Sequence, residues 1–240
     1  MTNTMNPTAA APTTGANGER TGQREQRKRA DAIHNVLKTL YPDALCSLES
    51  GGDPWRLLIA ARLSAQCTDE RVNIVCKPLF EAFPDCFAMA AAPVEAVEEI
   101  IRPCGLYHGK AVSCVEMSQI IASKFGGQVP DTMENLLSLP GVGRKIANLI
   151  LGDVYHKPGI VADTHCIRLN GRFGFYPESL KDPVKVEKIL SPIVPAEEQA
   201  DYCHRMVLFG RDVCTARNPK CGECPVREFC LHGMQETKQD

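Results

Sequence analysis

Apolar residues recur along most of the chain at the spacing of α-helices. The first such segment lies at 33–40 and places its apolar residues on one helical face. The segment 55–63 is apolar on most sides and follows Asp53-Pro54, a pair that starts helices with Asp as the N-cap. We expect this segment to form a central, buried helix. No stretch shows strand alternation or a hairpin turn, so the pattern predicts an all-α fold.

Further helices are predicted where helical spacing coincides with capping residues, glycines or prolines. They lie at about 69–80, 86–91, 94–102, 110–125, 132–139, 144–154, 164–169, 183–193 and 197–211. Pro78 lies inside the first of these segments and is expected to kink or split the helix.

Residues 1–26 carry almost no large apolar side chains and are rich in Thr, Ala, Asn, Gly and Pro. Such a segment cannot offset the entropy of ordering, so we expect a disordered tail. A basic run from Arg24 to Arg29 follows it. This run is expected to be a solvated face, with weak contact to DNA as the alternative.

A tight turn between two predicted helices is marked by Pro140 and Gly141. Gly143 has no Cβ and lets the backbone approach a ligand closely. The next helix begins at Arg144 and Lys145, and its unpaired peptide N–H groups form an anion site suited to a phosphate. This arrangement suggests chemistry on a nucleic acid.

The charge of the whole chain argues mildly against a nucleic-acid binder, because the formal net charge of its 240 residues is −2. Residues 144–172, however, hold five Lys or Arg against two acids, so this face can be basic. No apolar run has the length of a membrane span, and the N-terminus lacks the apolar core of a signal peptide. We therefore expect a cytoplasmic, nucleoid-associated protein.

Four of the twelve cysteines cluster near the C-terminus with the spacing C-x6-C-x2-C-x5-C. They are Cys214, Cys221, Cys224 and Cys230. In a reducing cytosol this clustering indicates a metal rather than disulfides, whereas the other eight cysteines are expected to act as small buried hydrophobes. The spacing alone leaves zinc and an iron–sulfur cluster as equal alternatives.

Together these segments resemble the helix–hairpin–helix DNA glycosylases of the endonuclease III type, over about residues 30–231. The matching motifs are Leu-Ser-Ala-Gln-Cys-Thr-Asp at 63–69, Gly-Leu-Tyr at 105–107 with Lys110, Leu-Pro-Gly-Val-Gly-Arg-Lys at 139–145, Val-Ala-Asp-Thr-His at 161–165 with Arg168, and the four cysteines. The resemblance implies a 4Fe–4S cluster in place of zinc.

The resemblance also implies two helical domains that flank a DNA-binding cleft. The first is a six-helix bundle at 47–157 that contains the helix–hairpin–helix at about 132–154. The second is a discontinuous iron–sulfur cluster domain formed by 27–46 and 158–240. The expected partner is double-stranded DNA with a damaged base or an abasic site, bound by a monomer.

The activity implied by the resemblance is that of a base excision repair glycosylase and abasic-site lyase for oxidised pyrimidines. Lys145 would attack C1′ of the nucleotide, release the base, form a Schiff base and nick the strand by β-elimination. Its amine must be neutral to attack, which Arg144 and the helix N-terminus favour. Asp163 would stabilise positive charge at C1′ and help deprotonate the lysine, besides capping a helix.

Because the base must be flipped out of the duplex, other residues must fill the gap. Gln66 and Leu106 match the family positions that do so, although a core role is the alternative for Leu106. Other DNA contacts are implied for Gly141, Val142, Gly143, Arg144 and Lys220, and weaker ones for His108, Lys110 and His165.

Two other functions remain as alternatives. One is a mismatch-specific glycosylase of the same superfamily, against which the presence of Lys145 argues. The other is a non-catalytic iron–sulfur protein that binds DNA. Asn218-Pro219 and Phe209 depart from the family pattern, but neither position belongs to the expected catalytic pair.

Overall fold

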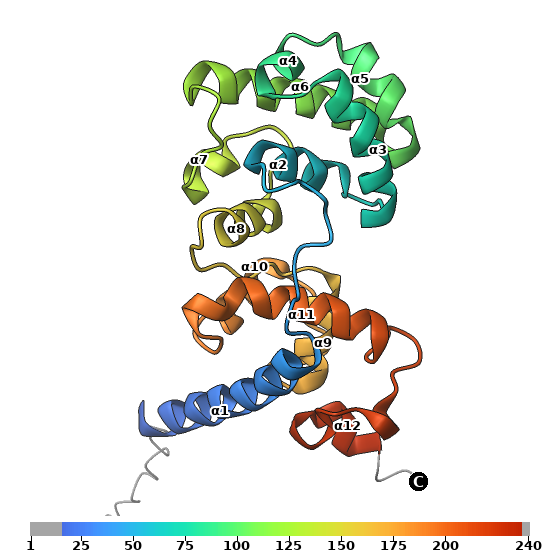
Figure 1. Cartoon of the computed structure of the whole chain (residues 1–240). Helices are drawn as coiled ribbons and strands as arrows, with labels where there is room; N and C mark the ends of the chain where they lie inside the picture. Colours follow the sequence, from blue (N-terminus) through green and yellow to red (C-terminus); the bar gives the residue numbers. More distant parts are fainter. Residues whose placement is uncertain (1–15, 237–240) are drawn as a thin grey trace, which may run out of the picture.

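In a computed structural model of the chain, residues 16–236 are described, and they contain helices, turns and loops but no strand (Figure 1). The predicted all-α fold is confirmed. The α-helices are α1 (Ala16–Leu40), α2 (Pro54–Leu63), α3 (Asp69–Ala82), α4 (Cys86–Ala90), α5 (Val94–Ile101), α6 (Tyr107–Lys124), α7 (Met133–Leu137), α8 (Arg144–Asp153), α9 (Thr164–Phe173), α10 (Pro183–Leu190), α11 (Gln199–Asp212) and α12 (Leu231–Glu236). Short 3-10 helices are η1 (Arg102–Cys104), η2 (Ala196–Glu198), η3 (Cys221–Glu223) and η4 (Arg227–Phe229).

The helices form two sets, which lie one above the other in Figure 1. The upper set comprises α2–α8, in which α4 and α5 pack on α6, and α7 packs on α8. The lower set comprises α1 and α9–α12, in which α11 packs on both α1 and α9. Helices α8 and α11 meet at the junction, so the start of α8 lies close to both sets.

Helix α2 is the buried centre of the upper set, as its pattern predicted. Its residues Leu58, Ile59, Ala60 and Leu63 are fully buried. The carboxylate of Asp53 accepts hydrogen bonds from the N–H groups of the first turn, which is the predicted N-cap.

The predicted tail at 1–26 is wrong for residues 16–26, because α1 begins at Ala16; residues 1–15 lie outside the described part. The segment 22–28 is rich in Arg, Glu, Gln and Lys, which favour a helix without being buried. The basic run also does more than face solvent. Arg27 Nε donates to the Pro192 carbonyl at 2.6 Å, and Arg29 donates to the Gly174 carbonyl at 3.0 Å.

Helix α3 runs as a single helix through Pro78, so the predicted split does not occur. Proline removes one peptide hydrogen bond from a helix. Val75 and Leu79 on either side are buried in the core, and this packing holds the helix together. Among residues 16–236, no helix is long and apolar enough to cross a bilayer.

Candidate active site

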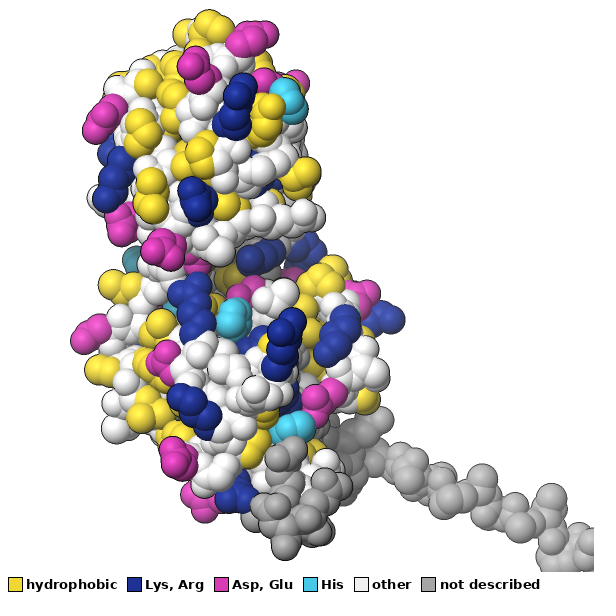
Figure 2. Space-filling view, turned by 90° about the vertical axis from the view of Figure 1, so that its right-hand side faces the viewer, with side chains coloured by type: hydrophobic (Ala, Val, Ile, Leu, Met, Phe, Trp, Pro, Cys, Tyr) yellow, Lys and Arg dark blue, Asp and Glu magenta, His cyan; other side chains and the backbone are white. Residues whose placement is uncertain are grey.

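A cavity of about 820 Å³ lies at the junction of the two helix sets. Gln66, Lys145, Asp163 and His165 all line it, although they come from three segments far apart in the sequence. Figure 2 shows the molecule narrowing between the two sets, with Lys and Arg side chains gathered on the lower one. The structure therefore brings the predicted lysine and aspartate to one hollow beside a basic surface.

Lys145 is the second residue of α8, and its exposed side chain lines the cavity. Gly143 is the N-cap and offers no capping side chain. The N–H groups of Gly143, Arg144 and Lys145 thus lie at the start of the helix, where no carbonyl of the same helix accepts them. This end of α8 has the geometry of an anion site.

Arg144 forms an ion pair with Glu187 of α10. Its Nε donates to Glu187 Oε2 at 2.9 Å, and its Nη2 contacts Oε1. Its positive charge is therefore compensated by a carboxylate. The expectation that Arg144 favours a neutral Lys145 stays a prediction.

Val142 holds the hairpin from the inside. Its side chain is buried, and its N–H donates to the Leu139 carbonyl at 3.1 Å. The DNA contact expected of Val142 stays a prediction. Gly141 has a φ of 77° and lies against the side chain of Arg62, so a tight turn and a close approach both require glycine here.

Asp163 is the N-cap of α9, and its Oδ1 accepts the Cys166 N–H at 2.7 Å. The residue is half-buried and lines the same cavity as Lys145. A buried bond from Asn148 Nδ2 to the Ile160 carbonyl, at 2.9 Å, joins α8 to the segment that leads to Asp163. The lysine and the aspartate are therefore held by elements that are themselves connected.

Gln66 and Leu106 share an uncommon backbone conformation. Among residues 16–236, the non-glycine residues with positive φ are Gln66 (55°), Leu106 (48°) and His156 (52°). Gln66 is exposed and Leu106 is 63% exposed, so a core role for Leu106 is excluded. Left-handed backbone in non-glycine residues costs energy and is found preferentially at functional sites.

The three residues for which weaker DNA contacts were expected lie in different environments. His108 is exposed and pairs with Glu98 at 2.9 Å. Lys110 is buried, and its ammonium donates to two carbonyl oxygens, so the weaker DNA contact expected of it, to phosphate or to the flipped base, is wrong. His165 lines the cavity; burial lowers its pKa, and Arg168 Nη2 lies 3.2 Å from its Nδ1.

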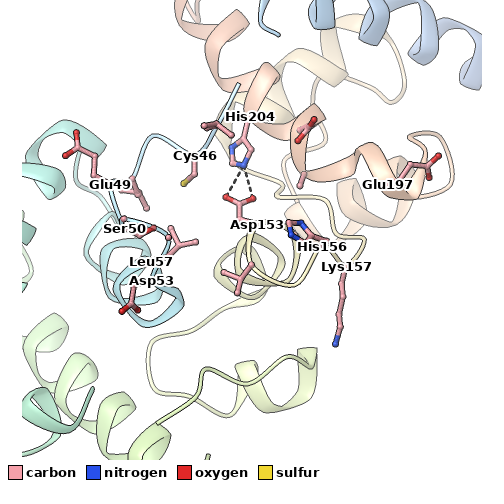
Figure 3. Close-up of a pocket in the computed structure, with 18 of the residues that line it drawn as sticks. Cys46, Glu49, Ser50, Asp53, Leu57, Asp153, His156, Lys157, Glu197 and His204 are labelled. Carbon is pink, nitrogen blue, oxygen red and sulfur yellow. Dashed lines mark hydrogen bonds and ion pairs between the residues drawn. The ribbon is translucent and has the colours of Figure 1, made fainter. Parts of the chain in front are cut away.

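Residues not predicted from the sequence also shape the cavity. Arg211 of α11 pairs with Asp69 of α3 at 2.9 Å and so connects the two helix sets across it. A neighbouring cavity of about 790 Å³ shares part of the 45–48 segment and His204 with it. There His204 Nε2 lies 2.9 Å from Asp153 Oδ1. Dashed lines in Figure 3 mark the contact between these two side chains. No local sequence signal identifies these pairs, because their partners lie more than 50 positions apart.

The four clustered cysteines line one narrow cavity beneath α9 and α11. Cys214 and Cys230 are buried, whereas Cys221 and Cys224 are half-buried. Arg172 Nη1 donates to Cys214 Sγ at 3.2 Å and to the Thr215 carbonyl at 2.7 Å. Among residues 16–236, no three Cys, His, Asp or Glu side chains stand close enough together to hold a single metal ion. All four cysteines nevertheless line one space and a cationic donor reaches one of them, so this donor set suits a thiolate-bound cluster whose negative charge needs compensation.

Lys220 lies beside this cavity in the loop between the first two cysteines, and its side chain is exposed. The loop carries Arg217 as a second exposed cation. A cluster that fixes this loop would therefore also fix a basic surface.

Comparison with known proteins yields two family matches. Residues 59–196 match the HhH-GPD superfamily of base excision DNA repair proteins. Residues 214–230 match the iron–sulfur binding domain of endonuclease III. The second match covers all four clustered cysteines.

Two curated relatives are similar over most of their length. Endonuclease III of Synechocystis sp. (strain ATCC 27184 / PCC 6803 / Kazusa) is 40% identical over 206 residues, which cover 85% of this chain and 93% of that protein. Endonuclease III of Bacillus subtilis (strain 168) is 39% identical over 213 residues, covering 88% and 96% respectively.

A solved structure described as a trapped endonuclease III–DNA covalent intermediate is also similar. It superposes with a TM-score of 0.82 at 38% sequence identity, and the match covers 88% of this chain and 98% of that one. A thermostable thymine-DNA glycosylase, at 22% identity and a TM-score of 0.77, shares the fold.

Proposed function

Because this chain belongs to the endonuclease III family of HhH-GPD base excision DNA repair proteins, we propose that it is a bifunctional glycosylase and abasic-site lyase for oxidised pyrimidines in duplex DNA. The observation that carries the proposal is that Lys145 and Asp163 line one cavity, each at the start of a helix. A nucleophile and a carboxylate in one hollow are the groups that cleavage of a glycosidic bond requires.

In the proposed reaction, Lys145 acts through its amine. A bond forms between Nζ and C1′ of the damaged nucleotide as the bond from C1′ to the base breaks, and the base leaves with the electron pair and takes up a proton. Nitrogen then loses a proton and its lone pair forms the C1′=N bond of a Schiff base as the C1′–O4′ bond breaks, and O4′ takes up a proton as the sugar ring opens. Loss of a proton from C2′ then expels the 3′ phosphate by β-elimination, and hydrolysis of the imine frees the lysine.

Asp163 has two roles in the attack of Lys145 on C1′. Its carboxylate accepts a proton from the lysine amine and stabilises the positive charge that develops at C1′. The cap bond to the Cys166 N–H fixes the carboxylate toward the cavity. Helix capping and catalysis are therefore compatible roles for one side chain.

DNA binding uses the start of α8 together with the exposed loops. The free N–H groups from Gly143 to Lys145 take a backbone phosphate, Gln66 and Leu106 fill the gap left by the flipped nucleotide, and Lys220 contacts the backbone further along. The partner is double-stranded DNA with a damaged base or an abasic site, bound by one copy of the chain. We place the protein with the chromosomal DNA of the nucleoid.

A 4Fe–4S cluster is the cofactor of this family, and Cys214, Cys221, Cys224 and Cys230 would hold it. When bound, it supplies a covalent framework that fixes the 214–230 loop and its cations. The reaction at the sugar uses Lys145 and Asp163, and no step passes through the cluster.

The proposal is tested with a panel of duplexes that each carry one altered base. Release of oxidised pyrimidines together with strand nicking is expected. Release of only mismatched adenine or thymine, without nicking, would favour the mismatch-specific alternative. Binding without release from any duplex would favour a non-catalytic DNA-binding protein.

A further inference from the structure

The loops that carry Gln66 and Leu106 are both bonded to one buried cation, Lys110. Its side chain is 1% exposed, and Nζ donates to the carbonyl oxygens of Leu63 at 2.8 Å and Cys104 at 2.9 Å. The backbone N–H of Lys110 also donates to the Leu106 carbonyl at 3.2 Å. One residue in the first turn of α6 thus links the two loops.

The two carbonyls that Lys110 binds lie at helix ends. Leu63 is the last residue of α2, and Cys104 is the last residue of η1. Carbonyls at helix C-termini lack partners within the helix and carry partial negative charge, so they attract a cation. Gln66 follows three positions after the first carbonyl, and Leu106 two positions after the second.

The ammonium of Lys110 makes its hydrogen bonds inside the protein. Burial lowers its pKa, and among residues 16–236 its side chain donates to the two carbonyls and pairs with no carboxylate. A buried cation is costly unless hydrogen bonds compensate it. The Lys110 ammonium therefore holds the Leu63 and Cys104 carbonyls close to each other. It thereby also fixes the loops that follow these two residues.

The left-handed backbone at Gln66 and Leu106 indicates why the two loops need the hydrogen bonds from Lys110. Such conformations persist where the surrounding structure enforces them. Both side chains are exposed, so packing of their own does not hold them. The anchor for each loop lies at its base, where Lys110 binds.

We propose that Lys110 is a positioning residue, which fixes the loops of Gln66 and Leu106 relative to each other so that both side chains enter the duplex together. The inference rests on the proposed function, because it requires that these two residues fill the gap left by a flipped nucleotide. It assigns Lys110 no part in the chemistry at C1′.

This role predicts a selective loss of activity. Filling a gap is necessary when the reacting nucleotide lies in a duplex, because a base pair must be opened and held open. An abasic site in single-stranded DNA needs no such opening, whereas the attack by Lys145 is the same. The ratio of kcat/KM on duplex DNA to kcat/KM on single-stranded DNA therefore reports on the positioning of the two loops. A change in the chemical step alone alters both values equally and leaves this ratio unchanged.

The experiment compares kcat/KM for abasic-site cleavage in both DNA forms, with the full, cluster-loaded chain. In Lys110→Met, which keeps the length of the side chain without its donors, we expect the duplex value to fall about 10- to 100-fold. The single-strand value should stay within about twofold of the wild type. Lys110→Arg, which keeps a cationic donor, should recover most of the ratio. Lys124→Met, at the exposed end of the same helix, should match the wild type.

An unchanged ratio in Lys110→Met would overturn the inference, whether both values stay normal or both fall together. If that variant does not fold, the same ratio is measured for Lys110→Leu, which also lacks a donor at this position, and it decides in the same way. A wild-type chain that cleaves neither DNA form would overturn the proposed function itself, and the inference with it.

Discussion

Asn148 and Ile160 are joined by a buried hydrogen bond from Nδ2 to the carbonyl oxygen, at 2.9 Å. Lys145 lies three positions before Asn148 on α8, and Asp163 lies three positions after Ile160. The bond therefore connects the two segments that carry the proposed nucleophile and the proposed carboxylate. It sets their separation at a point that substrate does not reach, because Asn148 is 2% exposed.

Replacement of Asn148 by alanine should weaken this connection. The buried Ile160 carbonyl would keep the Ala162 N–H as a donor but lose the bond from Asn148, which is expected to lower the free energy of unfolding by about 0.5–1.5 kcal/mol. It should also lower kcat on abasic DNA more than it raises KM, since the two catalytic groups lose their fixed spacing. Chemical denaturation and steady-state kinetics check both effects. Asn35→Ala, on the exposed face of α1, is the control and should change neither; equal behaviour of the two variants would contradict the connection.

Substitution of Asp163 by asparagine separates capping from catalysis. Asparagine caps helices about as well as aspartate, so the Cys166 N–H keeps its acceptor and the melting temperature should hold. Loss of the negative charge should slow base removal by about 10²- to 10⁴-fold while DNA binding is retained. The matched control is Asp182→Asn, which changes the N-cap of α10 outside the cavity and should remain fully active. Full activity of Asp163→Asn would refute the catalytic role.

Much of the fold follows from the sequence because helix ends are local. Asp53 and Asp163 cap the helices that they were predicted to cap. The C-terminal helix α12 was not predicted, because its six residues give too short a pattern to identify a period. Residues 16–26 were misjudged for a related reason, since low hydrophobicity does not prevent polar helix formers from extending a packed helix.

Side-chain partners were the harder part of the site to predict. The pairing of Arg144 with Glu187, 43 positions away, depends on how α10 packs near α8. The burial of Lys110 could likewise not be predicted from the sequence, because its acceptors are backbone carbonyl groups, which every residue possesses. A motif identifies which residues meet a ligand in a family, but the packing of distant segments decides which of them face inward.

Two glycines of the hairpin should respond differently to alanine. Gly141→Ala is expected to destabilise the protein by about 1–2 kcal/mol, because its φ of 77° strains an alanine. A methyl group there would also meet the side chain of Arg62. Gly143→Ala should fold normally, since its φ is −97° and a Cβ would have open space.

A measurement of DNA binding then shows whether Gly143→Ala, which is expected to fold normally, affects function. A methyl group at position 143 would stand where a phosphate approaches the N–H groups of α8, so duplex affinity should fall although thermal stability is unchanged. Fluorescence anisotropy with abasic-analogue DNA and thermal unfolding provide the two readouts. Unchanged affinity in Gly143→Ala would contradict phosphate binding at this helix end.

The cysteine loop makes a compositional prediction. The purified protein should be brown and contain about four iron and four sulfide per chain, as expected for four thiolates around one cluster. Cys221→Ser should lose most of the iron and weaken DNA binding, because the loop that carries Lys220 is no longer fixed. Cys86→Ser alters a buried cysteine of the upper set and should keep its iron. One zinc per chain without iron would overturn the assignment.

The most direct measurement is reductive trapping of the enzyme on abasic DNA. Borohydride reduces a Schiff base between Lys145 and C1′ to a stable amine, so the wild-type chain should give a covalent protein–DNA complex, and Lys145→Ala should bind the same DNA and give none. Lys157→Ala, which removes an exposed lysine paired with Asp131, should trap like the wild type. A trapped complex that persists in Lys145→Ala, or DNA binding by the wild type with neither trapping nor nicking, would contradict the account.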